Sequence, residues 1–359
     1  RYQGIRWTPK KFHTRNLKMH PKKFINAVMR KSLRLLSGCF TNKIGEAVGS
    51  NDAIKKILVC RPNHRLGSLL LLQPLVQELE STFPNSKIDL LVNQSCAIQL
   101  FQNYDNVNQV IELPRNPFKN PTKYISTFKR FRSIKYDLAI NAVMESSSGR
   151  LFTSISQARF KLVGDDEADK KERHIAKQVI HSLRDFLPIL GIKANDGLPP
   201  NLDLRLANDE LIHGGSLVYD IVQNPQPTIC LYPHTTGTEK WWLDLYQHLL
   251  KAFPDANIIE ILPKENSSRI KFNVPVFFTD DVRELAAIIA NTDVFIGPDS
   301  GVMHLASSSL TPTIGLFSVT EIEKYKPYNE GSVAIQTDGL KINELIVLVE
   351  NILYPNIST

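Results

Sequence analysis

The stretch VFIGPDSGVMHLASSSLTPTIGLF (294–317) places a carboxylate, a hydroxyl and an imidazole directly after a run of apolar residues. The apolar run predicts a strand, after which Asp299-Ser300-Gly301 opens a helix that carries His304. Asp299 or Ser300 is expected to cap this helix, and Gly301 would let a ligand approach the backbone. The N–H groups at such a helix start can bind anions or sugar hydroxyls. A capping Asp and a packing His are the alternative, but the strand–turn–helix context favours a binding site.

A second polar stretch, TICLYPHTTGTEKWWLDLYQHLL (228–250), also follows an apolar run. Thr235-Thr236-Gly237-Thr238 precedes Lys240, which stands at the start of a predicted helix. Hydroxyls, a glycine and a lysine at a helix N-terminus can hold a diphosphate without a metal. The spacing is not that of a Walker A loop. Trp241 and Trp242 are interpreted as core or interface anchors rather than base-stacking platforms.

The elements that position these residues alternate from Lys55 onward between short apolar runs and amphipathic stretches. This alternation predicts an α/β fold of parallel sheets with helices on both faces, in which ligands bind beyond the carboxyl ends of strands. The expected strands are 55–60, 87–92, 108–113, 136–143, 160–164, 228–233, 257–262, 274–280, 292–299 and 311–317. The expected helices are 69–83, 175–190, 241–253, 281–291, 301–309 and 340–353.

The stretch 192–210 is rich in Pro, Asn, Asp and Gly, so it is predicted to link two halves. The 359 residues exceed what one hydrophobic core usually supports. We therefore expect a basic segment (1–50) followed by two Rossmann-like, doubly wound domains (51–200 and 201–359) that face a cleft. The four cysteines are scattered, and they are interpreted as reduced thiols rather than zinc ligands.

The net charge of +7 is unevenly distributed. Residues 1–38 contain eleven Lys and Arg and no Asp or Glu, so the rest of the chain carries −4. A helix over 21–36 would have one apolar face, with the cations largely opposite. Such a basic amphipathic helix suits an anionic membrane surface; packing on the body or a disordered tail are the alternatives. No nucleic-acid module is recognisable, and no nucleic-acid partner is expected.

Together the two polar stretches resemble the ADP-heptose lipopolysaccharide heptosyltransferases, grouped as family 9 glycosyltransferases. A D-[ST]-G-x-x-H-[LI] motif and a following x-P-x-x-x-L-[FY] pattern match Asp299, Ser300, Gly301, His304, Leu305, Pro312, Leu316 and Phe317. A T-T-x-x-x-K-x-W motif matches Thr235, Thr236, Lys240 and Trp242. The resemblance covers about residues 55–350. It implies that the Thr pair and Lys240 contact the donor diphosphate, and that the 299–304 residues lie by the nucleotide sugar.

The family also has an R-x-x-x-L-G-D pattern followed by a proline. Leu66, Gly67 and Pro74 resemble it, and Arg61 resembles its arginine with one more residue before the leucine. The Asp after the glycine is the proposed catalytic base in the family, and this chain has Ser68 there. A hydroxyl is a far poorer base than a carboxylate at neutral pH. Either His64, in the same loop, or Glu145, after strand 136–143, could serve as the base instead. Alternatively, transfer depends mainly on stabilisation of the leaving group by Lys240, or the chain binds without catalysing.

The resemblance implies the GT-B arrangement, with the acceptor on the N-terminal domain and the nucleotide sugar on the C-terminal one. It implies an inverting glycosyltransferase without a metal or a resident cofactor, and a nucleotide-diphosphate sugar, ADP-linked, as co-substrate. The chain has no D-x-D motif, and Asp280-Asp281 is expected to start a helix. The acceptor would be a lipid-linked glycan such as the lipopolysaccharide core. A cytoplasmic, peripheral location at the inner face of the cytoplasmic membrane follows from these expectations.

Two other functions fit the same residues. One is a nucleotide-sugar epimerase on the same fold, which would act without an acceptor. The other is a catalytically impaired nucleotide-sugar-binding protein, which the serine at position 68 favours. A dehydrogenase is not expected, because neither half has a G-x-G-x-x-G fingerprint after its first strand.

Overall fold

The computed structural model describes residues 41–44, 49–94, 96–114, 120–164, 172–234, 236–264 and 267–355. The expected helix over 21–36 lies outside them, as do Cys39 and Thr235. None of the helices in the described ranges is long and apolar enough to cross a membrane. Among the remaining cysteines, Cys60 and Cys230 are buried free thiols, and burial raises the pKa of both.

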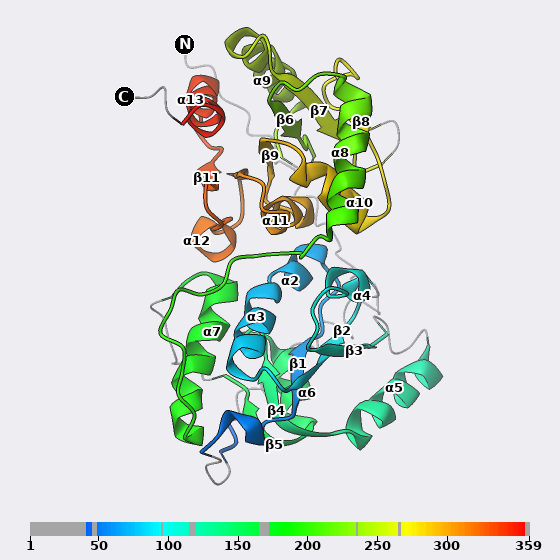
Figure 1. Cartoon of the computed structure of the whole chain (residues 1–359), viewed down its shortest axis with the longest axis vertical. Coiled ribbons are helices and arrows are strands. Elements are labelled where there is room, and N and C mark those ends of the chain that lie inside the picture. Colours follow the sequence, from blue (N-terminus) through cyan, green and yellow to red (C-terminus); the bar gives the residue numbers. More distant parts are fainter. Residues whose placement is uncertain are drawn as a thin grey trace, which may run out of the picture.

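The first half of the chain builds a parallel sheet in the order β3-β2-β1-β4-β5 (Figure 1). Its strands β1 and β2 are buried along almost their whole length, because helices cover both faces of the sheet. The strands are β1 (Lys56–Arg61), β2 (Lys87–Val92), β3 (Val107–Glu112), β4 (Lys135–Asn141) and β5 (Gln157–Leu162). The helices are α2 (Leu66–Leu70), α3 (Gln73–Thr82), α4 (Ala97–Leu100), α5 (Pro121–Ser133), α6 (Ser147–Ile155) and α7 (Ile175–Phe186), with short 3-10 turns η1 (Asn51–Ala53) and η2 (Leu187–Leu190).

The second half builds another parallel sheet in the order β11-β10-β9-β6-β7-β8. Strands β6, β9 and β10 lie side by side and are fully buried, and this places the loops that follow them at one edge of the sheet. The strands are β6 (Thr228–Leu231), β7 (Asn257–Ile261), β8 (Val276–Phe277), β9 (Val294–Pro298), β10 (Thr313–Phe317) and β11 (Val333–Gln336). The helices are α8 (Asn208–Val222), α9 (Glu239–Ala252), α10 (Val282–Ala290), α11 (Gly301–Ser308), α12 (Ile322–Tyr325) and α13 (Ile342–Leu353).

Several elements differ from the expected ones for identifiable reasons. The predicted helix 69–83 is two helices, because Pro74 cannot donate the backbone bond that would join them and stands instead in the first turn of α3. The predicted strand 274–280 shrinks to the two residues of β8 at the edge of the sheet. The predicted linker 192–210 ends earlier, because α8 starts at Asn208 with the Glu210 carboxylate accepting from the backbone N–H of Ala207. Helix α5 and strand β11 were not expected.

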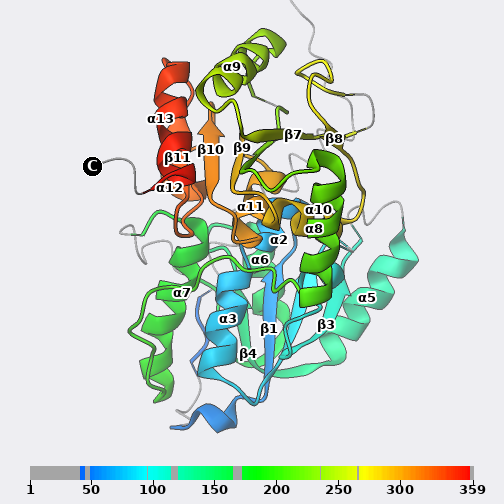
Figure 2. The ribbon, with the colours of Figure 1, turned by 45° about the horizontal axis from the view of Figure 1, so that its top comes forward.

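The connecting residues 192–207 pack against the first half of the chain. Tyr104 donates its hydroxyl to the carbonyl of Asp203 at 2.5 Å, and the Arg205 guanidinium lies 4.0 Å from the centre of the Tyr104 ring. The hydrophobic core continues across the boundary, since Ala286 of α10 and Leu305 of α11 belong to the same cluster as the buried residues of α2 and α3. The two sheets therefore meet through a packed contact between helices, visible between α2 and α11 in Figures 1 and 2.

Candidate active site

The turn between β9 and α11 has the geometry that its sequence predicts. Ser300 is the N-cap of α11, and its hydroxyl accepts from the backbone N–H of Met303 at 3.2 Å. Because Ser300 caps the helix, the Asp299 carboxylate is not needed for that purpose. It lies 3.8 Å from Nε2 of His304, and its side chain is 17% exposed. The carboxylate is therefore close to the imidazole and accessible to a hydroxyl.

His304 is buried between the two halves of the molecule. Burial lowers the pKa of His304 to about 4, and the nearby Asp299 carboxylate opposes this shift only in part. The imidazole is therefore neutral at pH 7. Its Nδ1 is buried and has no hydrogen-bond partner among the described residues.

Gly301 has a structural use that the sequence did not indicate. A Cβ on Gly301 would lie 3.0 Å from Cβ of Leu66 and 3.3 Å from the backbone N of Gly67. Because glycine has no side chain, helix α2 of the first half can pack directly against Gly301. This contact with α2 is a role for Gly301 in addition to the predicted close approach of a ligand to its backbone.

The loop after β6 lies beside this turn, because β6 and β9 are neighbours in the sheet. Thr238 is the N-cap of α9, with its hydroxyl accepting from the backbone N–H of Trp241 at 3.2 Å. Lys240 is in the first turn of α9 and is exposed. The Thr236 hydroxyl lies 3.5 Å from that of Ser318, which follows β10. Hydroxyls and backbone donors from three loops thus gather at one edge of the sheet.

Two cations from the β7–β8 connection add positive charge to this edge. The Arg269 guanidinium donates to the carbonyl of Gly237 at 3.1 Å. The pKa of His234, which precedes the loop, is lowered mainly by burial. The positive charges of Arg269 and Lys264 lower it further. The basic surroundings suit an anionic ligand next to Lys240.

The two tryptophans of α9 have different environments. Trp242 is fully buried, as expected of a core anchor, and its indole N–H donates to the carbonyl of Thr236 at 2.7 Å. Trp241 is partly exposed and lines a cavity of about 250 Å³ together with Thr236, Gly237, Thr238 and Thr337. Trp241 also packs against the core cluster that contains Trp242, so it is a partly buried anchor.

The candidates of the first half lie at the carboxyl end of its sheet. Ser68 is in α2, which packs against α11, while His64 is exposed in the loop before that helix. Glu145 follows β4, and its carboxylate accepts from Lys324 of α12 at 2.7 Å across the boundary. This bond raises the pKa of Lys324 more than burial lowers it. Glu145 is 70% exposed, so its carboxylate remains open to solvent.

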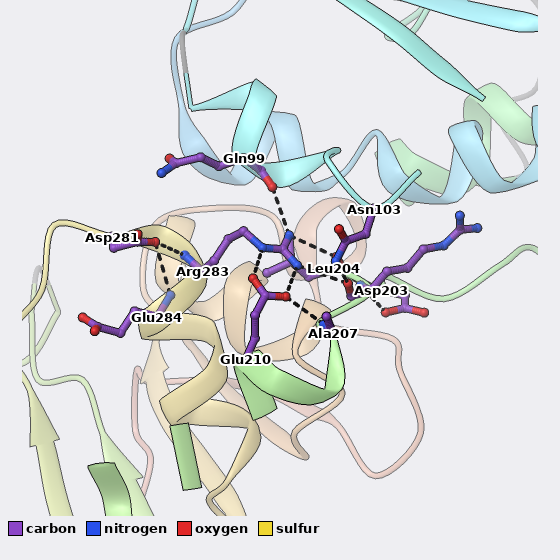
Figure 3. Close-up of polar contacts among 10 residues, drawn as sticks. Gln99, Asn103, Asp203, Leu204, Ala207, Glu210, Asp281, Arg283 and Glu284 are labelled. Atoms are coloured by element: carbon purple, nitrogen blue, oxygen red, sulfur yellow. Dashed lines mark hydrogen bonds and ion pairs between the residues drawn. The ribbon is translucent and has the colours of Figure 1, made fainter. Parts of the chain in front are cut away.

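A buried arginine joins the two halves on another side (Figure 3). Arg283 of α10 binds the Glu210 carboxylate through Nε at 2.5 Å and through Nη2 at 2.6 Å. Its Nη1 donates to the carbonyl of Gln99 in α4 at 3.0 Å. The same guanidinium also donates to the carbonyls of Leu204 and Arg205 in the connecting segment. Arg283 therefore links α10, α8, the connecting segment and the first half at one point.

Two parallel α/β sheets, helices on both faces, and polar loops at facing edges define the GT-B fold. Solved structures share this architecture. The family 9 glycosyl transferase from Veillonella parvula has a TM-score of 0.68 at 17% identity, with 86% of this chain and all of that chain (100%) covered. The E. coli ADP-heptose lipopolysaccharide heptosyltransferase II has a TM-score of 0.61 at 14% identity, over 84% of this chain and 99% of that chain.

The model of "Glycosyltransferase family 9 (heptosyltransferase)" matches residues 125–344, and this chain belongs to that family. Lipopolysaccharide heptosyltransferase 3 of E. coli is 22% identical over 74% of this chain and 85% of its own length. Lipooligosaccharide heptosyltransferase 2 of Haemophilus influenzae is 25% identical over 78% of this chain and 88% of its own length. The protein is therefore a glycosyltransferase similar to the heptosyltransferases of lipopolysaccharide biosynthesis, and the expected GT-B fold is confirmed.

Three residues of the site lie outside the two motifs and were not predicted from the sequence. Arg269 and Ser318 reach the 236–240 loop from other strand ends, and Thr337 follows a strand that was not expected. Apolar runs mark where strands end, but only the order of strands in the sheet shows which ends are neighbours. Glu265, in the connection that follows β7, lies outside the described residues. On β7 itself, Glu260 is buried and accepts from Ser268 and from the backbone N–H of Arg269.

Proposed function

We propose that this protein transfers a sugar, heptose or another, from an ADP-linked donor to a lipid-linked glycan such as the lipopolysaccharide core. The observation that carries the proposal is the proximity of two motif loops. The 236–240 loop and the 299–304 turn follow neighbouring strands and lie at one basic edge of the second sheet. The E. coli heptosyltransferase WaaC, whose structure with ADP has a TM-score of 0.60, supports an ADP-linked donor.

The donor's diphosphate would lie against Thr236, Lys240 and the N-terminus of α9, with Thr235 assigned by its motif position alone. The α9 helix has 14 residues, and its first N–H groups together with Lys240 would stabilise negative charge on the departing diphosphate. Asp299 would accept hydrogen bonds from the sugar hydroxyls. His304 would hold its place beside Asp299, because the neutral ring fills the contact with α2.

The transfer itself would be a single displacement with inversion. The acceptor oxygen attacks the anomeric carbon, the bond from that carbon to the diphosphate oxygen breaks, and the hydroxyl proton passes to a base. Ser68 cannot fill the base's role as a carboxylate would, so Glu145 and His64 are the candidates. We propose that the reaction needs neither a metal nor a resident cofactor, since Lys240 and the α9 N-terminus would supply positive charge. Turnover that is sensitive to EDTA would contradict this part.

The acceptor is membrane-linked in this proposal, and the enzyme would reside on the inner face of the cytoplasmic membrane of a bacterium. The basic segment 1–38 would contact anionic lipid. Residues 41–44 follow this segment in the sequence and are described by the structure. Lys43 forms an isolated antiparallel bridge with Lys161 on the edge strand β5. Burial lowers the pKa of Lys161, and the positive charges of Lys43 and Arg132 lower it further. The described residues that follow the segment therefore lie at a cationic edge, which would attract anionic lipid.

The serine at position 68 favours one second candidate, a protein that binds the nucleotide sugar without transferring it. The distinguishing result would be donor binding without transfer across a panel of lipid-linked acceptors.

Calorimetric titration with ADP, UDP, GDP and CMP tests the donor site. We expect micromolar binding of ADP that Lys240→Ala abolishes or weakens strongly. Lys251→Ala is the matched control, because Lys251 is an exposed lysine in the last turn of the same helix. If the wild-type protein binds none of the four nucleotides, the proposed donor site is wrong.

A further inference from the structure

Helix α5 of the first half is anchored by few apolar side chains and carries only positive charge. Between Glu112 and Asp137 the chain has seven Lys and Arg and no acidic residue. Within α5, Phe131 is fully buried, and Tyr124 and Phe128 are partly buried against the same core cluster. These three side chains share one face of the helix, which holds α5 to the sheet. The cations of the helix therefore lie on its other faces.

The outward face of α5 combines exposed cations with one exposed aliphatic side chain. Lys123, Lys129, Arg130 and Arg132 are all exposed, and Ile125 among them is 53% exposed. The helix lies along the outer flank of the first half, as both views of the molecule show (Figures 1 and 2). This face is thus a cationic surface with an apolar side chain at its centre, and it is open to solvent.

No carboxylate of the described residues neutralises this face. Arg130 donates to the side-chain oxygen of Gln109 at 2.5 Å, and Arg132 donates to the carbonyl of Ile155. Both acceptors are uncharged. The two lysines of the face form no ion pair within the described part of the chain. The face therefore keeps its full positive charge for an external partner.

The positive surface continues from α5 onto the edge strand β5. Lys161 donates to the carbonyl of Ser154 at 2.5 Å, and Arg132 binds the carbonyl of the next residue, so both cations lie at the C-terminal end of α6. Lys43, which forms a bridge with Lys161, follows the segment 1–38 with its eleven cations. The cations thus extend from α5 to the residues that follow the basic segment.

We propose that the outward face of α5 docks on an anionic membrane and acts together with the segment 1–38. The inference rests on the proposed function for its membrane-linked acceptor, and it adds a surface of the folded first half. Cations spread along an exposed helix match a layer of anionic headgroups, and an aliphatic side chain among them can enter the interface. Single-stranded nucleic acid would instead need exposed aromatic rings on which its bases stack.

Flotation of the full chain with vesicles of equal parts phosphatidylglycerol and phosphatidylcholine tests the surface, with phosphatidylcholine alone as the comparison. Each cation near an anionic surface contributes about 5-fold in affinity, so the double variant Lys123→Gln with Lys129→Gln should bind roughly 25-fold more weakly. Ile125→Gln should also weaken binding, but without changing its dependence on salt. Lys251→Gln with Lys341→Gln is the matched control, because it removes two exposed lysines from the second half.

Wild-type binding by the α5 double variant would overturn the proposal, and so would an equal loss in the control variant. Tighter α5-dependent binding to a single-stranded oligonucleotide than to the vesicles would show that the partner is a nucleic acid. If the wild-type protein does not bind the anionic vesicles, the docking surface is wrong. ADP titration of the same preparation tests the donor site separately, so failure of the surface is distinguishable from failure of the proposed function.

Discussion

Gly67 of α2 packs directly against the imidazole of His304 in α11, so closely that a Cβ on Gly67 would lie 2.6 Å from Cδ2 of His304. The glycine precedes Ser68, which stands at the position of the family's proposed base. The imidazole belongs to the proposed donor site. The contact between the two halves of the molecule and the proposed reaction centre therefore coincide, and their geometry depends on the absence of side chains at Gly67 and Gly301.

Gly67→Ala is expected to lower kcat by about 10²-fold, because small displacements of reacting groups cost roughly that much. The new methyl group cannot fit without moving α2 or the buried imidazole. The loss should appear in turnover with a donor and a lipid-linked acceptor, while ADP affinity changes little. Gly197→Ala is the control, since a Cβ there meets only the Asn195 side chain, at 3.3 Å. Wild-type turnover in Gly67→Ala would show that the close approach is not needed.

Acid is expected to destabilise the protein through two buried histidines. Burial lowers the pKa of His304 to about 4 and that of His174 to about 3. An unfolded histidine binds its proton near pH 6.5, so below that pH the unfolded chain takes up protons that the folded chain does not. The free energy of unfolding is therefore greatest above pH 6.5 and falls as the pH falls towards 4.

His174→Asn should remove one half of this dependence. The His174 ring accepts from the backbone N–H of Ala176 as the N-cap of α7, and an asparagine can do the same without titrating. Between pH 7 and pH 5 the variant should lose about 1–2 kcal/mol less stability than the wild type, measured by denaturant unfolding. His248→Asn, at a side chain that is 41% exposed, should follow the wild-type curve. A His174→Asn curve parallel to the wild type would contradict the assignment.

The two sheets could be predicted well from the sequence because buried parallel strands have continuous runs of apolar residues. Strand β2 occupies the predicted residues 87–92, and strand β1 is shifted by one residue. Elements with weaker apolar runs were missed. Helix α5 has only Phe131 fully buried, and strand β11 is a partly exposed edge strand. Edge and surface elements bury too little apolar area to leave a clear pattern.

The candidate site was predictable to the extent that it follows strand ends. The cap at Ser300 and the helix start at Asp281 are where the sequence placed them. The contact of Gly301 with α2 was not predictable, because it joins residues that are more than 200 positions apart. The same is true of the pair of Lys324 with Glu145, since neither residue's neighbours in sequence indicate a partner in the other half.

Arg283→Ala is expected to reduce the free energy of unfolding by about 3–5 kcal/mol, because it leaves the Glu210 carboxylate without its cation and removes the donor to several carbonyls. Denaturant unfolding followed by far-ultraviolet circular dichroism measures the change. Lys271→Ala is the comparison, since its pair with Glu239 joins side chains that are 64% and 56% exposed, and such pairs contribute about 0–1 kcal/mol. Equal midpoints for the two variants would mean that Arg283 does not hold the two halves together.

Glu145→Gln is expected to lower kcat by roughly 10²- to 10⁴-fold, which is the typical contribution of a general base. We favour Glu145 over His64 because Lys324 binds its carboxylate from the opposite half, so the side chain lies where the two sheets face each other. His64→Ala should have the smaller effect. Steady-state turnover at saturating donor distinguishes the two, with ADP affinity as the measure of intact binding. Wild-type turnover in both variants would exclude both residues as the base.

Removal of residues 1–38 is expected to release the protein from vesicles that contain anionic lipid. The segment carries eleven cations, and each one near an anionic surface contributes about 1 kcal/mol. Flotation with anionic and with neutral vesicles, at low and at high salt, measures the effect. Leu33→Gln in the full chain separates the apolar face from the charge, because Leu33 would lie on the apolar face of a helix over 21–36 and the substitution leaves the net charge unchanged. If the full and the shortened chains float equally, the segment does not bring the enzyme to the membrane and the acceptor must be reached by another surface.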